Sequence, residues 1–162
     1  MFFAGSHHLT IDAKNRLSIP FGVRRKLSED ADGHAFYIVP GRRQGTLSLY
    51  AEKYFERTRS VGPADDALSD DAYSYREFEY SQTALLEPDS QGRVLLPERL
   101  LQRCGIDKEV ALIGVRDHLE LWRRTDLESF EDGTWPEYPK KRAVATHELN
   151  ELAAELGSST AG

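Results

Sequence analysis

The stretch from Leu9 to Pro20 recurs from Leu86 to Pro97, and this repeat constrains the fold more than any other feature of the sequence. The two copies read LTIDAKNRLSIP and LEPDSQGRVLLP. An acid, an arginine and a proline keep their places at a spacing of 77 residues: Asp12 and Asp89, Arg16 and Arg93, Pro20 and Pro97. A repeat at a fixed spacing indicates that the chain contains two copies of one structural unit.

Each copy predicts a tight β-hairpin. The first strand is expected to run into Asp12, turn over residues 13–15 and leave through residues 17–19, where apolar and polar residues alternate. Asn15 in the first copy and Gly92 in the second occupy the turn position that requires a positive φ. Asp12 and Asp89 are expected to accept backbone N–H bonds from the residues two positions further on.

The similarity between the copies continues beyond the hairpins. A helix is expected after each proline, over residues 21–27 and 98–104, with Gly105 as the C-terminal cap of the second. A second hairpin follows in each copy (36–39 with 47–50, and 110–113 with 119–122), and then a short helix (52–59 and 125–130). The first copy carries five extra residues, which we place at Arg42–Gly45 and the preceding loop. The order of hairpin, helix, hairpin and helix predicts an α+β fold.

The remaining segments connect or follow the two copies. We place the first repeat at residues 1–60, an acidic connecting segment at 61–83, the second repeat at 84–131 and a tail at 132–162. The connecting segment is predicted to be helical from Asp70 to Thr83, with an aromatic stripe on the core. The tail is predicted to contain an amphipathic helix over residues 144–156, because Leu149, Leu152 and Leu156 have helical spacing. Residues 157–162 are small and polar, and are expected to be disordered.

Composition limits the classes of function. The 162 residues, 40% of them hydrophobic, suffice for one core or for two small halves that share one. The single cysteine excludes an intramolecular disulfide, and no cluster of residues has the spacing of a zinc site. We expect no metal, no cofactor and no enzymatic activity, because no nucleophile motif or phosphate loop is present. No apolar run is long enough to span a bilayer, so a cytoplasmic protein without a membrane partner is expected.

Charge is distributed unevenly along the chain. The net charge is −6, which does not indicate a general nucleic-acid-binding protein. Residues 1–28, however, contain five basic residues and one acid, whereas residues 62–89 contain eight acids and one basic residue. An asymmetry of this kind permits a basic face on an acidic protein.

Three segments resemble the bacterial MraZ family, which belongs to the AbrB-like swapped-hairpin superfamily: DAKNRLSIP, DSQGRVLLP and LIGVRDHLELW. The resemblance covers about residues 1–130, and Asn15 replaces the glycine usual in the family's first turn. It implies a swapped-hairpin β-barrel with short helices. It also implies a transcriptional repressor that binds short direct repeats of double-stranded DNA in the promoter of the division and cell-wall gene cluster. Further implications are a ring-shaped homo-oligomer and a nucleoid-associated location.

The candidate DNA-binding residues lie in and after the two turns. A two-stranded ribbon fits the DNA major groove, and an arginine at its turn can donate two parallel hydrogen bonds to guanine. Arg16 and Arg93 are the matching arginines carried over from the family motif, and Asp12, Asp89 and Gly92 are expected to hold the turns. The other candidates belong to the first copy, which we expect to be the main reader of DNA because the second turn has no lysine: Lys14, Asn15, Arg24, Arg25 and Lys26.

Two other classes of function remain open from the residues alone. The first is a protein-interaction module of the antitoxin type, which would share the fold but act through the segment from Val144 to Leu156. The second is an enzyme that uses Asp12 and Asp89 as a catalytic pair, although each aspartate is better explained by its turn. The sequence also leaves open whether hairpins are exchanged within one chain or between chains.

Overall fold

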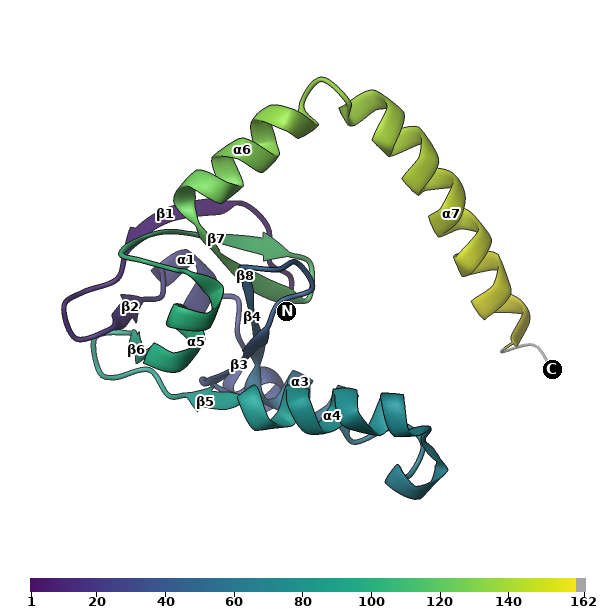
Figure 1. Cartoon of the computed structure of the whole chain (residues 1–162), viewed down its shortest axis with the longest axis horizontal. Coiled ribbons are helices and arrows are strands. Elements are labelled where there is room, and N and C mark those ends of the chain that lie inside the picture. The colour runs from purple at the N-terminus through teal and green to yellow at the C-terminus, as the bar shows by residue number, and fades with distance from the viewer. Residues whose placement is uncertain (160–162) are drawn as a thin grey trace. The chain divides into compact units, whose positions relative to one another are not determined.

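Both sheets of the protein combine strands from the two sequence copies, as the computed structural model shows for the described residues 1–159 (Figure 1). The larger sheet has six strands, and all neighbouring strands are antiparallel. Its order is β1 (Ser6–Thr10), β7 (Glu109–Val115), β8 (His118–Arg123), β4 (Leu47–Ala51), β3 (Phe36–Pro40) and β5 (Ala84–Leu86). The smaller sheet is an antiparallel ribbon of β2 (Arg16–Ser18) and β6 (Arg93–Leu95).

The prediction that each repeated stretch forms its own hairpin is wrong. β1 pairs with β7 of the second copy, and β5 of the second copy pairs with β3 of the first. The strands that leave the two turns, β2 and β6, pair with each other. The two copies therefore exchange strands within one chain. This exchange buries the apolar side of the ribbon between the copies, which neither turn could achieve by itself.

The helices are mostly short. They are α1 (Phe21–Arg24), α2 (Glu29–Asp32), α3 (Glu52–Arg59), the 3₁₀ turn η1 (Asp65–Ala67), α4 (Asp70–Gln82), α5 (Glu98–Cys104), α6 (Arg124–Thr134) and α7 (Tyr138–Ser159). The bounds predicted for α3 and α5 are confirmed, and Gly105 ends α5 in the left-handed conformation with φ 63°. α1 is shorter than predicted, because the N–H groups of Lys26 and Leu27 bond three residues back rather than four.

One hydrophobic core serves both copies. Leu17 of β2 and Val94 of β6 are directly paired, and both are fully buried. Around them pack Ile11 and Ile19 of the first copy and Leu96 of the second. This arrangement confirms that two small halves share a core, as expected for repeats of this size.

The aromatic residues of α4 do not form the predicted stripe on the core. Tyr73, Tyr75, Phe78 and Tyr80 are between 41% and 65% exposed, and α4 contributes no buried residue. Successive residues of a helix are rotated by about 100°. Tyr73 and Tyr80 therefore lie on one side of α4, whereas Tyr75 and Phe78 lie near the opposite side. No single apolar face exists that could cover the core.

The chain divides after Arg124 into two compact units, of which the second comprises nearly all of α6 and the whole of α7. α6 extends to Thr134, four residues beyond the predicted end. α7 confirms the predicted tail helix, with Val144, Leu149, Leu152 and Leu156 exposed along it. The expectation of disorder is wrong for residues 157–159, which are helical, and residues 160–162 lie outside the described part of the chain. No helix within residues 1–159 is long and apolar enough to cross a membrane.

Candidate nucleic-acid interface

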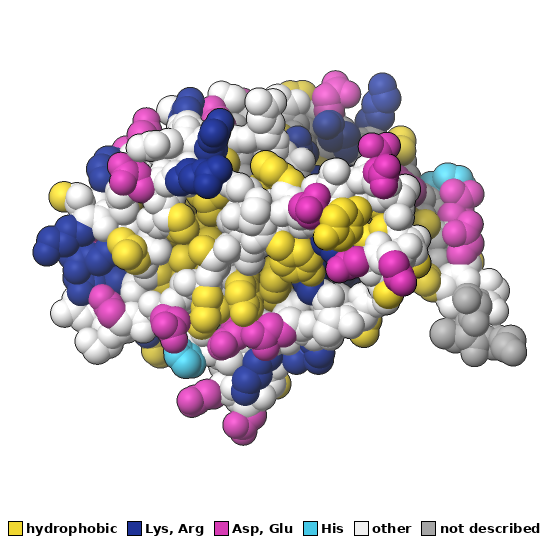
Figure 2. Space-filling model, turned by 60° about the horizontal axis from the view of Figure 1, so that its bottom comes forward, with side chains coloured by type: hydrophobic (Ala, Val, Ile, Leu, Met, Phe, Trp, Pro, Cys, Tyr) yellow, Lys and Arg dark blue, Asp and Glu magenta, His cyan; other side chains and the backbone are white. Residues whose placement is uncertain are grey.

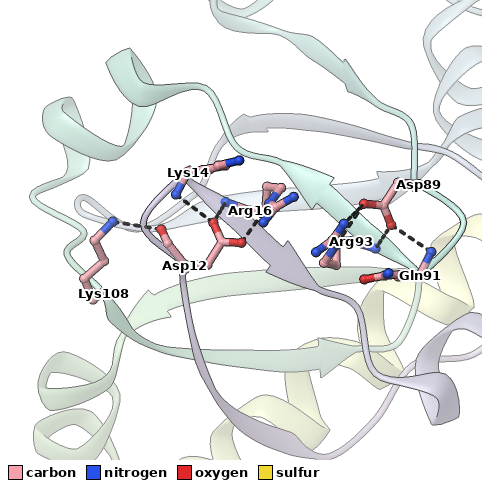
Figure 3. A network of polar contacts seen from close by, with 7 residues as sticks. All are labelled: Asp12, Lys14, Arg16, Asp89, Gln91, Arg93 and Lys108. Atoms are coloured by element: carbon pink, nitrogen blue, oxygen red, sulfur yellow. Dashed lines mark hydrogen bonds and ion pairs between the residues drawn. The ribbon is translucent and has the colours of Figure 1, made fainter.

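The first turn is held by the carboxylate of Asp12. Its Oδ1 accepts the backbone N–H groups of Lys14 and Arg16, both at 2.9 Å, and its Oδ2 accepts Nε of Arg16 at 2.7 Å (Figure 3). The backbone closes the same turn, because the N–H of Asp12 donates to the carbonyl of Arg16 at 2.9 Å and that of Asn15 donates to the carbonyl of Asp12 at 3.0 Å. Asn15 has the positive φ that the sequence predicts, 58°.

The second turn reproduces these contacts with Asp89. Its Oδ1 accepts the N–H groups of Gln91 at 2.9 Å and Arg93 at 3.0 Å, and its Oδ2 accepts Nε of Arg93 at 2.8 Å (Figure 3). Gly92 takes the place of Asn15, with φ 75°. In both turns one carboxylate therefore fixes the backbone and the arginine side chain together.

The turns are joined by reciprocal hydrogen bonds. The N–H of Ile19 donates to the carbonyl of Gly92 at 2.9 Å, and the N–H of Leu96 donates to the carbonyl of Asn15 at 2.8 Å. Between these bonds, Arg16 pairs with Leu95 and Arg93 pairs with Ser18 across the ribbon. Because residues of the two copies differ by 77, these two pairs are equivalent, and the ribbon has local two-fold symmetry about the central pair of residues.

The ribbon has one buried face and one accessible face. Side chains alternate along a strand, so the central pair Leu17 and Val94 faces the core. The opposite face carries Arg16, Ser18, Arg93 and Leu95. The side chains of Arg16 and Arg93 are 31% and 27% exposed, so neither arginine is sealed inside the protein.

The carboxylates of both turns are stabilised in their charged form. The pKa of Asp12 is lowered, chiefly because it accepts the backbone N–H of Arg16. The pKa of Asp89 is lowered from 3.8 to about 2, chiefly by the hydrogen bond from the side chain of Arg93 and next by the backbone N–H of the same residue. Both turns therefore keep a negatively charged carboxylate beside the arginine at neutral pH.

The lowered pKa of Asp89 predicts an acid-dependent contribution to stability. A carboxyl whose pKa is lower in the folded protein stabilises the fold above its unfolded pKa of 3.8, and this contribution is lost as pH falls towards about 2. The wild type should therefore exceed Asp89→Asn in free energy of unfolding at about pH 6, and this difference should shrink at about pH 2.5. Urea denaturation at both pH values measures it, with Asp66→Asn as a control outside the ribbon. A difference that does not change with pH would contradict the assignment.

The remaining predicted residues have different surroundings. Lys14, Arg25 and Lys26 are exposed. Arg24 is half-buried: its Nε donates to the carbonyl of Ile19 at 3.0 Å, and its guanidinium lies against Gly92 of the second turn. Arg24 thus connects the helix of the first copy to the turn of the second, a structural contact that the sequence analysis did not expect.

Sequence reasoning missed Lys108, whose Nζ donates to the backbone carbonyl of Asp12 at 2.9 Å (Figure 3). Lys108 lies 96 residues beyond Asp12 and belongs to the loop before β7, so no local pattern connects them. The first turn therefore gains a second nearby lysine. Figure 2 shows Lys and Arg side chains gathered at the left end of the molecule, where Figure 1 shows β2, β6 and their turns.

The arrangement is suited to binding. Each aspartate is occupied by its turn, and the described residues contain no group of three or more His, Cys, Asp or Glu that could hold a metal ion. A guanidinium has five N–H donors. The turn uses the one on Nε in Arg16, and in Arg93 both Nε and Nη2 lie 2.8 Å from Oδ2 of Asp89. The ribbon thus presents two oriented arginines on one narrow, accessible face.

Comparison with known proteins relates the chain to one family. Residues 80–145 match the family model described as "MraZ protein, putative antitoxin-like". A protein named transcriptional regulator MraZ from Burkholderia cenocepacia is 34% identical over 120 residues, which cover 74% of this chain and 81% of the relative. A protein of the same name from Mycoplasmopsis pulmonis is 30% identical over 132 residues, which cover 82% of this chain and 86% of the relative.

The match extends further than the resemblance seen in the sequence. A transcriptional regulator MraZ from Heliobacterium modesticaldum is 30% identical over 149 residues, which cover 92% of this chain and 94% of the relative. Because those 149 residues are taken from a chain of 162, the match continues past Phe130, where we expected it to end. The matches to full-length relatives and the doubled aspartate–arginine turn lead to one conclusion. The chain belongs to the MraZ family.

Proposed function

We propose that this protein is a DNA-binding transcriptional regulator that reads bases with its turn arginines. The observation that carries the proposal is the accessible face of the ribbon, on which Arg16 and Arg93 are each held by an aspartate four residues earlier. The relatives' name, transcriptional regulator, supports the same function.

The physical argument concerns shape and donors. A two-stranded β-ribbon is narrow enough for the major groove of B-DNA. An arginine there can donate two parallel hydrogen bonds to O6 and N7 of guanine, which is worth about 1–3 kcal/mol of discrimination. Fixing Nε in the free protein reduces the side-chain freedom that is lost on binding. Lys14, Arg25 and Lys26 are exposed and available for phosphate contacts, which set the register of the protein on the duplex.

The first turn is proposed to be the main reader. Lys14 and Lys108 lie at this turn, whereas the second turn has Ser90 and Gln91 in the corresponding stretch and the half-buried Arg24 beside it. Positive charge beside the reading arginine increases the attraction to the DNA backbone. Arg93 then has a secondary role in DNA binding, in addition to its contact with Asp89.

The proposed target is a set of short direct repeats in the promoter of the division and cell-wall gene cluster, at which the protein acts as a repressor. One chain offers few base contacts, so useful affinity requires several linked copies that read adjacent repeats. A ring-shaped homo-oligomer supplies this multivalency, and its place of action is the cytoplasmic nucleoid. The exchanged pairing of β1 with β7 and of β5 with β3 supports a swapped-hairpin unit as the building block.

Footprinting on the DNA immediately upstream of the protein's own coding region tests this proposal, together with the molecular mass in solution. The expected result is protection that recurs at a constant spacing, given by a species with the mass of several chains. Protection should require the oligomer, because single copies bind weakly. Uniform protection without any spacing would indicate non-specific binding and would contradict the proposal.

A protein-interaction module of the antitoxin type is the second candidate function. It is favoured by α7, on which Val144, Leu149, Leu152 and Leu156 are between 47% and 71% exposed. Exposed apolar residues along one helix are typical of a surface that binds a partner. The family model's description as antitoxin-like points in the same direction.

Deletion of the residues after Lys140 separates the two functions. If the turn arginines carry the function, the shortened protein should bind its operator with an affinity within about threefold of the full chain, because the ribbon is untouched. A gel-shift titration at fixed salt measures this affinity. Loss of regulation in the cell with operator binding retained in vitro would instead favour the interaction module.

A further inference from the structure

Three arginines line one hollow of about 390 Å³ that is separate from the ribbon. Arg43 comes from the loop between β3 and β4, and Arg99 and Arg103 come from α5. Polar side chains of Gln44, Thr46 and Gln82 complete the polar part of the lining. Among the described residues that line this hollow, none is an aspartate or a glutamate.

The two arginines of α5 are on the same side of the helix. Residues four apart are neighbours on a helix surface, and like charges at that spacing destabilise it. Both Arg99 and Arg103 are exposed, and neither side chain makes a hydrogen bond or ion pair within residues 1–159. A bound anion would relieve the repulsion between them.

Arg43 is positioned from the other side of the hollow. Its guanidinium lies over the ring of Trp122, 5.8 Å from the ring centroid, in a cation–π contact. The pKa of Glu120 is lowered chiefly by its hydrogen bond with His118 and to a smaller extent by the charge of Arg43. Arg43 as a whole residue is exposed.

The loop that carries Arg43 is fixed to α5. The N–H of Gly41 donates to the carbonyl of Thr46 at 2.9 Å, and the hydroxyl of Thr46 donates to the carbonyl of Arg43 at 2.7 Å. The thiol of Cys104, in the last turn of α5, lies 3.7 Å from the carbonyl of Thr46. This loop contains the extra residues that distinguish the first copy from the second, in which only a tight turn joins β7 to β8.

We propose that Arg43, Arg99 and Arg103 form a phosphate-binding site. Guanidinium groups bind phosphate oxygens through paired, charge-assisted hydrogen bonds. The side-chain amides of Gln44 and Gln82 can donate neutral hydrogen bonds to the same oxygens, whereas the hydroxyl of Thr46 already donates to the carbonyl of Arg43. The phosphate group can belong to the backbone of DNA or to a small phosphate ester. Only the first of these sources depends on the proposed DNA-binding function.

The larger hollow beside α4, about 780 Å³ in volume, does not have this chemistry. It contains Arg42 and Arg59, but also Glu79, Asp117 and Glu120. Arg59 is paired with Glu79 at 2.9 Å, so its charge is compensated within the protein. The absence of lining carboxylates therefore distinguishes the site of Arg43, Arg99 and Arg103.

Calorimetric titration with pyrophosphate at constant ionic strength tests the site directly. The wild type should bind pyrophosphate, and Arg99→Gln combined with Arg103→Gln should weaken binding by about tenfold or more, because two charged donors are removed. Arg142→Gln, an exposed arginine of α7, is the matched control and should bind like the wild type. Arg16→Ala should also retain pyrophosphate binding, which separates this site from the proposed base reader.

A second double variant guards against loss of the fold. Arg99→Lys with Arg103→Lys keeps both charges but removes the paired donors, so its affinity for pyrophosphate should lie between those of the wild type and the glutamine variant. Melting temperature and solution mass are compared for every variant.

The salt dependence of DNA binding identifies the source of the phosphate. If DNA supplies it, the glutamine variant should reduce the slope of log K against log salt by about 0.9 for each DNA phosphate that the variant no longer neutralises, with sequence preference unchanged. Pyrophosphate binding with an unchanged salt slope would assign the site to a small phosphate ester. A glutamine variant that matches the wild type in both pyrophosphate affinity and salt slope would overturn the proposal.

Discussion

Replacement of Arg16 by alanine is expected to abolish specific operator binding while the fold and the oligomer survive. The loss of one pair of hydrogen bonds to guanine should reduce discrimination by about 1–3 kcal/mol at each site, or roughly fivefold to 150-fold. Because linked copies bind adjacent repeats, this reduction is repeated at each site. The stability should change little, since the ion pair between Arg16 and Asp12 lies at the surface.

The measurement is a gel-shift titration at several salt concentrations, with operator and scrambled DNA compared at each. Lys14→Ala is the contrasting variant: it should weaken binding to all sequences and reduce the salt slope by about one. Arg93→Ala is the matched variant in the second turn, and a smaller loss of specificity is expected from it. Unchanged operator affinity of Arg16→Ala at fixed salt would remove the base-reading role of the first turn.

The turns could be predicted from the sequence because their chemistry is local. Asp12 contacts residues no more than four positions away, and the φ of Asn15 depends on the turn alone. The same holds for α5, whose glycine cap follows its last helical residue directly. Because the aspartate, the turn residue and the arginine occur in both copies, the sequence also predicts that both turns have the same structure.

The pairing of the strands could not be predicted in the same way. Alternating apolar residues indicate a strand with a buried face, but they do not identify its partner. Ser6 of β1 pairs with Ile113, a residue more than a hundred positions away. A strand that pairs within a local hairpin would show the same alternation of apolar residues, so the alternation does not distinguish the two pairings. The contact of Lys108 with the first turn and the contact of Arg24 with the second both depend on this exchange. These two contacts of the candidate site therefore follow from the tertiary structure.

The exposure of α4 has a different explanation. The aromatic residues of α4 suggest a stripe by their number, but their positions alternate between opposite sides of the helix. A count of aromatic residues in a segment does not establish an apolar face, which requires that the residues share an angular position.

Gly92→Ala is expected to destabilise the protein through the second turn. Gly92 has φ 75°, and a non-glycine residue in the left-handed conformation costs about 1–2 kcal/mol. A Cβ atom there would also lie 2.6 Å from Cζ of Arg24, so the guanidinium would have to move and give up its bond to the carbonyl of Ile19. The free energy of unfolding should fall by about 1–3 kcal/mol, with a lower midpoint in urea denaturation.

A double-mutant cycle with Arg24→Ala separates the two causes. If displacement of the guanidinium contributes, Arg24→Ala combined with Gly92→Ala should be less destabilised than the sum of the single variants. The cost that remains is backbone strain, and Gly92→Asn should reduce it in the Arg24→Ala background, because asparagine tolerates the left-handed conformation and occupies the same place in the first turn. A Gly92→Ala protein as stable as the wild type would show that the second turn can change its backbone conformation. The symmetric hydrogen bonds between Gly92 and Ile19, and between Asn15 and Leu96, would then not be required for the ribbon.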